Sequence, residues 1–205
     1  KGTKTQQGRG DLLAVDIGGA TTDVYSMASG EPTVDNTMLK GLPEPWMKRT
    51  VEGDLGMRYS LTHVYEQIPG SDNPENEYMQ QVKAWVELCT ARPDTLAAPG
   101  SEEEKLEEFL GRSAVSMAVE RHCGRIADVY TPLGLMHTQE GKDLMNVPSV
   151  IGIGGVLRNS RRPEEILKGS LYDFMHPECT KPRKPKFYLD QKYIFASMGL
   201  LRSIN

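Results

Sequence analysis

The stretch DLLAVDIGGATTDVYSM, residues 11–27, decides the fold. Leu12 to Ile17 is a short apolar run rich in branched residues, which predicts a buried strand. Gly18-Gly19 interrupts this run, and the β-branched and aromatic residues from Thr21 to Met27 predict a second strand. Two such strands joined by a glycine turn predict an antiparallel hairpin.

The tip of the hairpin, DIGGATTD at residues 16–23, has the composition of a phosphate-binding turn. Gly18 and Gly19 have no Cβ, so the backbone can turn tightly and approach a ligand closely. Backbone N–H groups in such a turn, together with the hydroxyls of Thr21 and Thr22, suit phosphate oxygens. A bare glycine pair is more often an ordinary hairpin turn, but the clustering of Asp, Gly and Thr in this segment reverses that preference.

Two carboxylates flank the same turn, with Asp16 before it and Asp23 after it. Mg²⁺ prefers oxygen ligands, keeps several of its waters and is often held beside nucleotide phosphates. The pair therefore predicts a magnesium ion, held through water, next to bound phosphates.

A second glycine signal is GIGGVLR, residues 152–158, at the end of a predicted strand. It is not a dinucleotide fingerprint, because that pattern requires a third glycine where Leu157 stands. Alone the segment is a weak signal, and its value lies in its pairing with the hairpin. Gly154 and Gly155 would allow a close approach to a ligand. Arg158 could lay its planar guanidinium against a base, although a solvated surface arginine is an equally good interpretation.

The rest of the chain predicts helices and strands in mixed order, which indicates an α/β fold. Residues 71–112 are expected to form a helical insertion, and Glu102 to Glu108 is interpreted as its solvated acidic face. The expected helices are 54–68, 74–89, a short acidic helix from 101, 113–123, 163–169 and a last one from Asp190, with further strands at 33–39, 125–131 and 148–153 and a loop at 176–186.

Bulk composition gives no reason to expect nucleic acid or a membrane as a partner. The chain has 205 residues and a net charge of −4, and no apolar run approaches the length of a membrane span. Three widely spaced cysteines and the lack of a signal peptide predict a cytoplasmic location. The polar, Gly-rich start without an initiator Met reads as a linker, so we expect a piece of a longer protein.

The two glycine motifs together resemble the second half of the actin, Hsp70 and sugar-kinase superfamily of ATPases. DIGGATTD resembles its second phosphate loop, and GGVLR resembles its adenosine motif. A narrower match covers nearly the whole chain and is similar to the MutL-type accessory proteins encoded beside glutamate mutase, which are unrelated to the mismatch-repair protein of that name. The segments that carry it are LLAVDIGGATTDVYS, RTVEGDLGMRYS, AVERHCGRI, VYTPLG, VIGIGGVLRNS and PKFYLDQKYIFASMGLL.

The resemblance implies an actin-like ATPase domain of the ribonuclease H-like kind, with a mixed β-sheet flanked by helices. Residues 1–205 would be the second, C-terminal domain, because the sequence contains one DxGGxT hairpin and not two. ATP or ADP with Mg²⁺ would be the cofactors. The implied partners are the protein's own N-terminal half and the subunits of an adenosylcobalamin-dependent mutase.

By position in the motif, the resemblance places the hairpin tip at the phosphates. Gly18 and Gly19 would approach the β- and γ-phosphates, and Thr21 would reach the γ-phosphate. Asp16 would lie near the metal through water, and Asp23 would support the metal or a water.

The resemblance also assigns residues to the adenosine and to the helix after the hairpin. Gly154 and Gly155 would pass under the adenosine with Arg158 against the base, while Val156 replaces a polar residue found in relatives such as Hsp70. Gly53, in EGDLG, would let a helix N-terminus face the phosphates, with a simple capping loop as an equally weighted alternative.

Three functions stay open at this level. The first is an ATP-driven chaperone or reactivating protein for a mutase. The second is a small-molecule kinase of the same superfamily, and the third is a degenerate domain that only makes protein contacts. Since an opposing phosphate loop is missing, we expect this chain alone not to turn over ATP.

Overall fold

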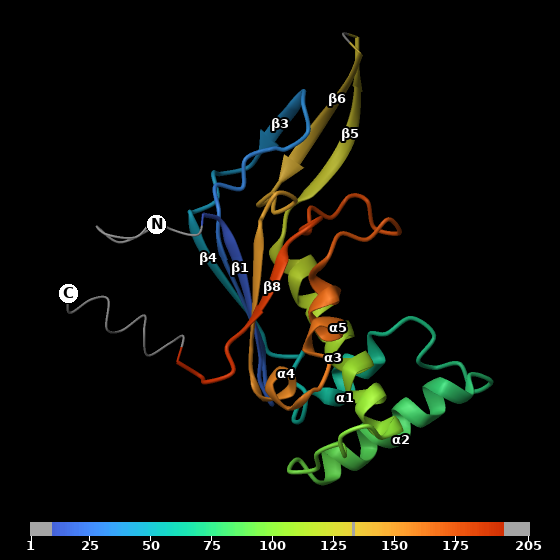
Figure 1. The fold of residues 1–205 in the computed structure, drawn as a ribbon. Coiled ribbons are helices and arrows are strands. Elements are labelled where there is room, and N and C mark those ends of the chain that lie inside the picture. Colours follow the sequence, from blue (N-terminus) through green and yellow to red (C-terminus); the bar gives the residue numbers. More distant parts are fainter. Residues whose placement is uncertain (1–9, 133, 195–205) are drawn as a thin grey trace.

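The computed structural model describes residues 10–132 and 134–194, and their frame is a five-stranded mixed sheet (Figure 1). The strand order is β4-β2-β1-β7-β8. β1 pairs antiparallel with β2 and parallel with β7, so the predicted hairpin is confirmed. The strand bounds are β1 Leu12–Ile17, β2 Thr22–Met27, β4 Met47–Glu52, β7 Ser149–Ile153 and β8 Lys186–Leu189.

The described helices gather on one side of this sheet (Figure 1). The longest, α3, packs against β1, β2 and β4, and it also carries α5 and η1. Because helices cover this face of a mixed sheet, the predicted α/β fold is confirmed. The helix bounds are α1 Leu61–Glu66, α2 Glu77–Ala91, α3 Glu102–His122, α4 Gly155–Asn159, α5 Pro163–Leu167 and the 3₁₀ helix η1 Lys168–Ser170.

The core lies between this sheet face and α3. Successive strand side chains point to opposite faces, so every second residue of β1 enters the core. These residues are Leu13, Val15 and Ile17, which are fully buried. The stripe that meets them on α3 is also fully buried and consists of Ala114, Val115, Ala118 and Val119.

A buried histidine closes the far end of this core. His122, the last residue of α3, is fully buried, and its two ring nitrogens lie 2.8 Å from Ser26 Oγ and 2.9 Å from Thr50 Oγ1. Burial, followed by the nearby Lys48 and Lys142, lowers its pKa to about 3. The ring is therefore neutral in the folded protein and satisfied by two hydroxyls.

A second, three-stranded sheet projects from the body (Figure 1). Its order is β3-β6-β5, with bounds Thr37–Lys40, Gly134–Glu140 and Arg125–Thr131. Lys142 joins it to the main sheet, since its buried Nζ donates to the carbonyls of Pro45 and Trp46 at 2.8 and 2.7 Å.

Several boundaries differ from the sequence predictions. The helices expected from 101 and over 113–123 are one continuous helix, α3. β4, β6 and β8 were not predicted, and the strand expected at 33–39 is the shorter β3, in the second sheet. The insertion expected at 71–112 would end inside α3, and it stays a prediction. Most of the helix expected from Asp190 lies outside the described residues.

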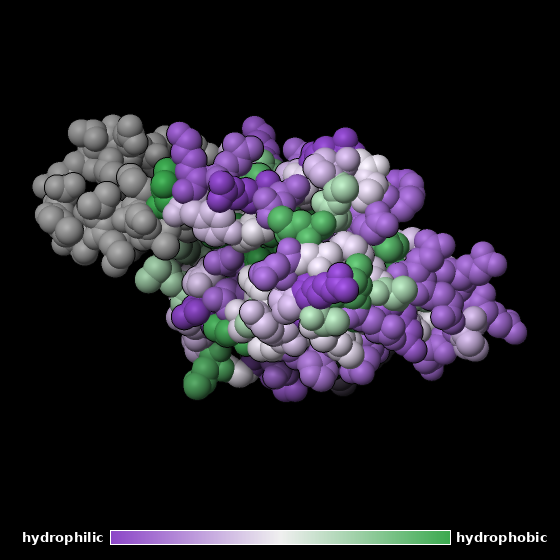
Figure 2. All heavy atoms as spheres, turned by 90° about the horizontal axis from the view of Figure 1, so that it is seen from below, coloured by the Kyte–Doolittle hydropathy of each residue, from purple (hydrophilic) through white to green (hydrophobic). Residues whose placement is uncertain are grey.

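None of the described helices combines the length and the apolar character needed to cross a membrane. Seen from below, hydrophilic side chains cover most of this end of the molecule, and hydrophobic ones appear in small separate patches (Figure 2).

Candidate functional site

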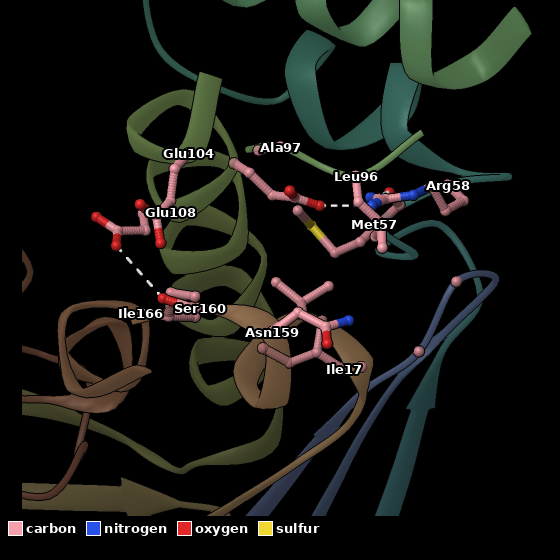
Figure 3. Close-up of a pocket in the computed structure, with 15 residues that line it drawn as sticks. Ile17, Met57, Arg58, Leu96, Ala97, Glu104, Glu108, Asn159, Ser160 and Ile166 are labelled. Atoms are coloured by element: carbon pink, nitrogen blue, oxygen red, sulfur yellow. Dashed lines mark hydrogen bonds and ion pairs between the residues drawn. The ribbon is translucent and has the colours of Figure 1, made fainter. Parts of the chain in front are cut away.

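The two glycine turns lie next to each other at the carboxyl ends of β1 and β7, two inner strands of the main sheet. β1 and β7 are parallel neighbours, with Asp16 paired to Ile153, so their carboxyl ends lie side by side. Ligands bind outside such strand ends in α/β proteins. Gly18, Gly19 and Gly155 line one cavity of about 200 Å³ (Figure 3). Residues far apart in the sequence are thus brought together as the paired motifs predicted.

The first turn is held by its carbonyl groups. The carbonyl of Gly19 accepts from the N–H groups of Arg58 and Tyr59 at 2.8 and 2.9 Å, and that of Gly18 accepts from Met57 at 3.0 Å. The N–H groups of Gly19 and Ala20 have no acceptor in the part of the chain that the structure describes. These two donors are available to a ligand.

In the second turn, the backbone of Gly154 packs directly against the backbone at the end of β1. Gly154 has φ +113°, and a Cβ there would lie 2.2 Å from the carbonyl oxygen of Ile17 at the end of β1. Only glycine can adopt this backbone without a clash. Gly154 then becomes the N-cap of α4, and Gly155, the first helical residue, faces the cavity.

Carboxylates from α3 form the opposite wall of the cavity (Figure 3). Glu104 and Glu108 are buried, at 8% and 7% exposure, so the solvated acidic face predicted for Glu102 to Glu108 is wrong for these positions. The reason is tertiary, because α3 turns this side toward α4 and α5 instead of solvent. The spacing of four residues, which puts both on one helix face, was the available signal.

Each of the three cavity carboxylates has a basic partner. Glu104 accepts from Arg161 Nε at 3.1 Å and Glu107 from Arg58 Nη2 at 2.6 Å. Hydrogen bonds from the N–H groups of Gly100 and Arg161 hold the pKa of Glu104 below its ordinary value, so it is ionised at neutral pH.

Glu108 is the third of these carboxylates. It pairs with Arg162 Nη2 and accepts from Ser160 Oγ at 3.3 Å. The α3 wall is therefore rich in acceptors but carries no unpaired charge among the described residues.

The two predicted metal carboxylates lie on the other face of the sheet. Asp16 and Asp23 are paired residues of β1 and β2, and neither lines the cavity. Burial, then Asp23 and then Asp190, raises the pKa of Asp16. Asp23 Oδ2 accepts from Arg49 Nη2 at 3.0 Å, while its buried Oδ1 has no hydrogen-bond partner within the described ranges.

This donor set fits a hydrated cation better than a directly bound one. The described residues contain no group of three or more side chains that could hold a metal ion. An orphaned carboxylate oxygen on Asp23 and mutually repelling carboxylates nevertheless favour positive charge nearby. The site thus suits Mg²⁺ that keeps its waters.

The other residues predicted at the phosphates are placed differently. Thr22 is fully buried, and its hydroxyl donates to the carbonyl of Leu55 at 2.6 Å, inside the protein. Thr21 uses its carbonyl to accept from Gly18 N at 2.9 Å within the turn. The carbonyl of Gly53 accepts from Ser60 Oγ at 2.8 Å, and Gly53 does not line the cavity.

Arg158 does not line the cavity. It is exposed, and its guanidinium lies 5.7 Å from the ring centroid of Tyr193. A Cβ on Gly155 would lie 3.6 Å from the hydroxyl of Tyr193, so this tyrosine sits at the second turn. Sequence reasoning did not select Tyr193, although it stands in the last segment of the family-like pattern.

These observations define a class of protein. It is an α/β domain in which a glycine hairpin and a distal strand–glycine–helix turn open on one cavity at the carboxyl ends of parallel strands.

The comparisons with known proteins give the family. Residues 2–205 match the family model described as MutL protein. The chain is 47% identical over 204 residues to Protein MutL of Clostridium tetanomorphum, an alignment that covers 98% of this chain and 44% of that relative. The chain belongs to the MutL protein family and spans less than half of the length of this relative.

Proposed function

We propose that this chain is the nucleotide-binding, C-terminal half of an actin-like, ATP-dependent accessory protein that serves an adenosylcobalamin-dependent mutase of the glutamate mutase type. The observation that carries the nucleotide part is the convergence of Gly18, Gly19 and Gly155 on one cavity. The mutase part is supported by the resemblance and by membership of the MutL family.

The β1–β2 turn offers a hydrogen-bond donor to the cavity, and the α3 wall offers acceptors. A nucleotide needs both, donors for its phosphates and acceptors for its sugar and base. The first turn offers the N–H group of Gly19, a residue of the cavity lining, which has no acceptor among the described residues and suits a phosphate oxygen. The α3 wall carries the carboxylates of Glu104 and Glu108. Each already accepts three hydrogen bonds from the protein, so one of the about four lone-pair sites of a carboxylate would be left for a hydroxyl or amino group of a nucleoside. A nucleotide would lie with its phosphates at the β1–β2 turn and its sugar and base toward α3.

The size of the cavity is consistent with half of a site. Ligand pockets usually measure about 300–1,000 Å³, and this cavity measures about 200 Å³. A second wall from the longer protein would complete it. Asp16 and Asp23 lie outside this cavity, so a hydrated Mg²⁺ near them would supply positive charge to phosphates that extend past the β1–β2 turn.

A small-molecule kinase is less well supported. A kinase of this kind needs a carboxylate that can accept the proton of a substrate hydroxyl. The carboxylates of Glu104, Glu107 and Glu108 in the cavity are each engaged by an arginine. None of these three is free for that role.

The test compares this chain with the full-length protein. Calorimetry with MgATP should show weak binding to the chain and tighter binding to the full-length protein, and only the latter should hydrolyse ATP. Purified glutamate mutase subunits should be retained by the immobilised full-length protein to different extents with ATP, ADP or no nucleotide. Steady ATPase activity of the chain alone, abolished by Asp16→Ala, would contradict the half-site proposal, and mutase retention that ignores nucleotide would contradict ATP dependence.

A further inference from the structure

A second hollow lies further along α3 than the cavity at the glycine turns. It is formed by α3, η1 and the loop that follows η1, and it measures about 450 Å³. We call it the α3–η1 groove. Its lining includes Phe109, Arg112, Ser116, Lys168, Tyr172 and Phe174.

The floor of the groove is firmly built. A Cβ on Gly169 of η1 would lie 2.3 Å from the carbonyl oxygen of Arg112, so η1 is pressed directly on the backbone of α3. The main chain of the following loop is also fixed, since Tyr172 N donates to the carbonyl of Pro182 at 2.8 Å. The groove therefore belongs to the folded body.

Hydrogen-bond donors and positive charge dominate the lining. The side chain of Arg112 is exposed and makes no hydrogen bond or close ion pair with any described residue, and its charge acts at longer range on Glu165. Below the floor, the ammonium of Lys181, a residue only 2% exposed, donates to Ser116 Oγ at 2.9 Å. Because that hydroxyl oxygen accepts from Lys181, its proton is free to be donated into the groove.

The lining holds one acidic residue against two basic ones, Arg112 and Lys168. Asp173 is the acidic residue in its lining, and its Oδ1 accepts from the backbone N–H of Met175 at 2.9 Å. Lys168 is paired with Glu165 at 2.6 Å. On a chain whose net charge is −4, a hollow with a cationic excess is complementary to an acidic ligand.

The rim of the groove is aromatic and exposed. Phe174 and Met175 are 87% and 81% exposed. The rings of Tyr172 and Phe174 meet edge to face with centroids 5.3 Å apart, and the guanidinium of Arg183 lies 5.3 Å from the ring centroid of Tyr172. Exposed aromatic residues, Met and Arg together are the composition of protein–protein hot spots and not of an ordinary solvated surface.

We propose that the α3–η1 groove docks an acidic segment of a partner protein, with an aromatic or large aliphatic side chain of that segment packed against Phe174 and its carboxylates facing Arg112. The aromatic rim favours a protein segment over a small inorganic anion, because an anion would use the donors but not the exposed ring. This docking does not depend on nucleotide binding.

The experiment uses a fluorescein-labelled peptide in which Glu and Asp residues surround a single Trp, titrated into the full-length protein and followed by anisotropy. Saturable binding is expected. Phe174→Ala should weaken it about tenfold, as loss of a hot-spot ring does. Arg112→Glu should weaken it about tenfold at low salt and less at high salt, because the charge contribution is screened.

Matched controls come from the same chain. Leu42→Ala removes another apolar side chain that is 93% exposed, and Lys83→Glu reverses another exposed helical cation. Both should leave the affinity within twofold, and far-UV circular dichroism should show all four variants folded.

Four outcomes would overturn the proposal. The first is a lack of saturable binding, and the second is equal affinity for a peptide with Lys in place of each acidic residue. The third is competition by millimolar inorganic phosphate as effective as competition by unlabelled peptide, which would make the groove a small-anion site. The fourth is binding to the 205-residue chain but not to the full-length protein, which would mean that the rest of the longer chain covers the groove.

Discussion

The two glycine turns at the cavity use the same residue for different reasons. In the β7–α4 turn, Gly154 has a positive φ and touches the backbone of β1, so the fold itself requires glycine there. In the β1–β2 turn, Gly19 has no positive φ, and a Cβ would lie 3.7 Å or more from its nearest neighbours on Arg58 and Tyr59. The folded protein has room for a methyl group at Gly19.

This difference separates structural from functional glycine. A glycine that the fold does not require, beside two unused N–H groups, is best explained by the close approach of a ligand. The β7–α4 turn sets the distance between two strands, and the β1–β2 turn offers the contact surface. Four measurements can break or sharpen this distinction.

The largest effect is expected from Gly154→Ala. The positive φ and the 2.2 Å approach to Ile17 should lower the free energy of unfolding by about 3–5 kcal/mol, measured by denaturant titration. Gly155→Ala is the matched control, because its Cβ would meet nothing closer than 3.6 Å, and it should change stability by less than about 1 kcal/mol. Equal effects of the two substitutions would remove the distinction between them.

The second test concerns the end of the core that lies away from the first turn. His122 hydrogen-bonds Ser26 of β2, and its pKa of about 3 lies below the ordinary value, so its contribution is complete above pH 6.5 and is lost as the pH falls toward 3. Between pH 7 and pH 5 the free energy of unfolding should drop by about 2 kcal/mol.

The control for this pH effect is His122→Gln, which removes the titrating ring and should flatten the slope between pH 7 and pH 5. The exposed His63→Gln should keep the slope of the unmodified protein. An unchanged slope in His122→Gln would show that another group is responsible.

The third test is Gly19→Ala, measured in the full-length protein. Stability should change by less than about 1 kcal/mol, whereas affinity for MgATP should fall about tenfold, since a methyl group would stand between the turn and the phosphates. Loss of stability without loss of affinity would make Gly19 a structural glycine like Gly154.

The smallest effect is expected from Arg158→Ala. An exposed guanidinium over a ring contributes about 0.5–1 kcal/mol, so the affinity for MgATP should fall about twofold to fivefold if Arg158 contacts the base. Tyr193→Ala removes the ring next to the Arg158 guanidinium. Measuring the affinity of this variant for MgATP shows whether the contact between Arg158 and Tyr193 contributes to binding. Unchanged affinity in Arg158→Ala would exclude the role at the base.

The sequence was most informative where the signal is local. The β1–β2 hairpin and the glycines after β7 are short patterns with a direct backbone meaning, and the structure brings both to one cavity. The two turns come together because β1 pairs with β7. The presence of two glycine motifs suggests this pairing, but the hydrophobic periodicity of the sequence does not reveal it.

The missed elements depend on tertiary contacts. β4 exposes Met47 and Val51, so its pattern is not that of a strand with one clean apolar face. α3 continues through Gly111, which the sequence alone would favour as a helix end. A glycine suits this position because a Cβ there would lie only 3.2 Å from Ile166 of α5. The spacing of Glu104 and Glu108 puts them on one helix face, but their burial could not be predicted, because their arginine partners follow more than 50 residues later.

The pairing of Leu13 with Val150 also has a consequence for synthesis of the protein. β2, β4 and α3 can associate with β1 as the chain leaves the ribosome, but β7 is made long after them. Until β7 is made, the edge of β1 that will pair with it has no partner. An exposed hydrophobic strand edge can pair with the wrong strand. Contacts so distant in sequence form slowly. The cavity is therefore a late product of translation, and a chain stalled before residue 149 carries the first turn without its counterpart.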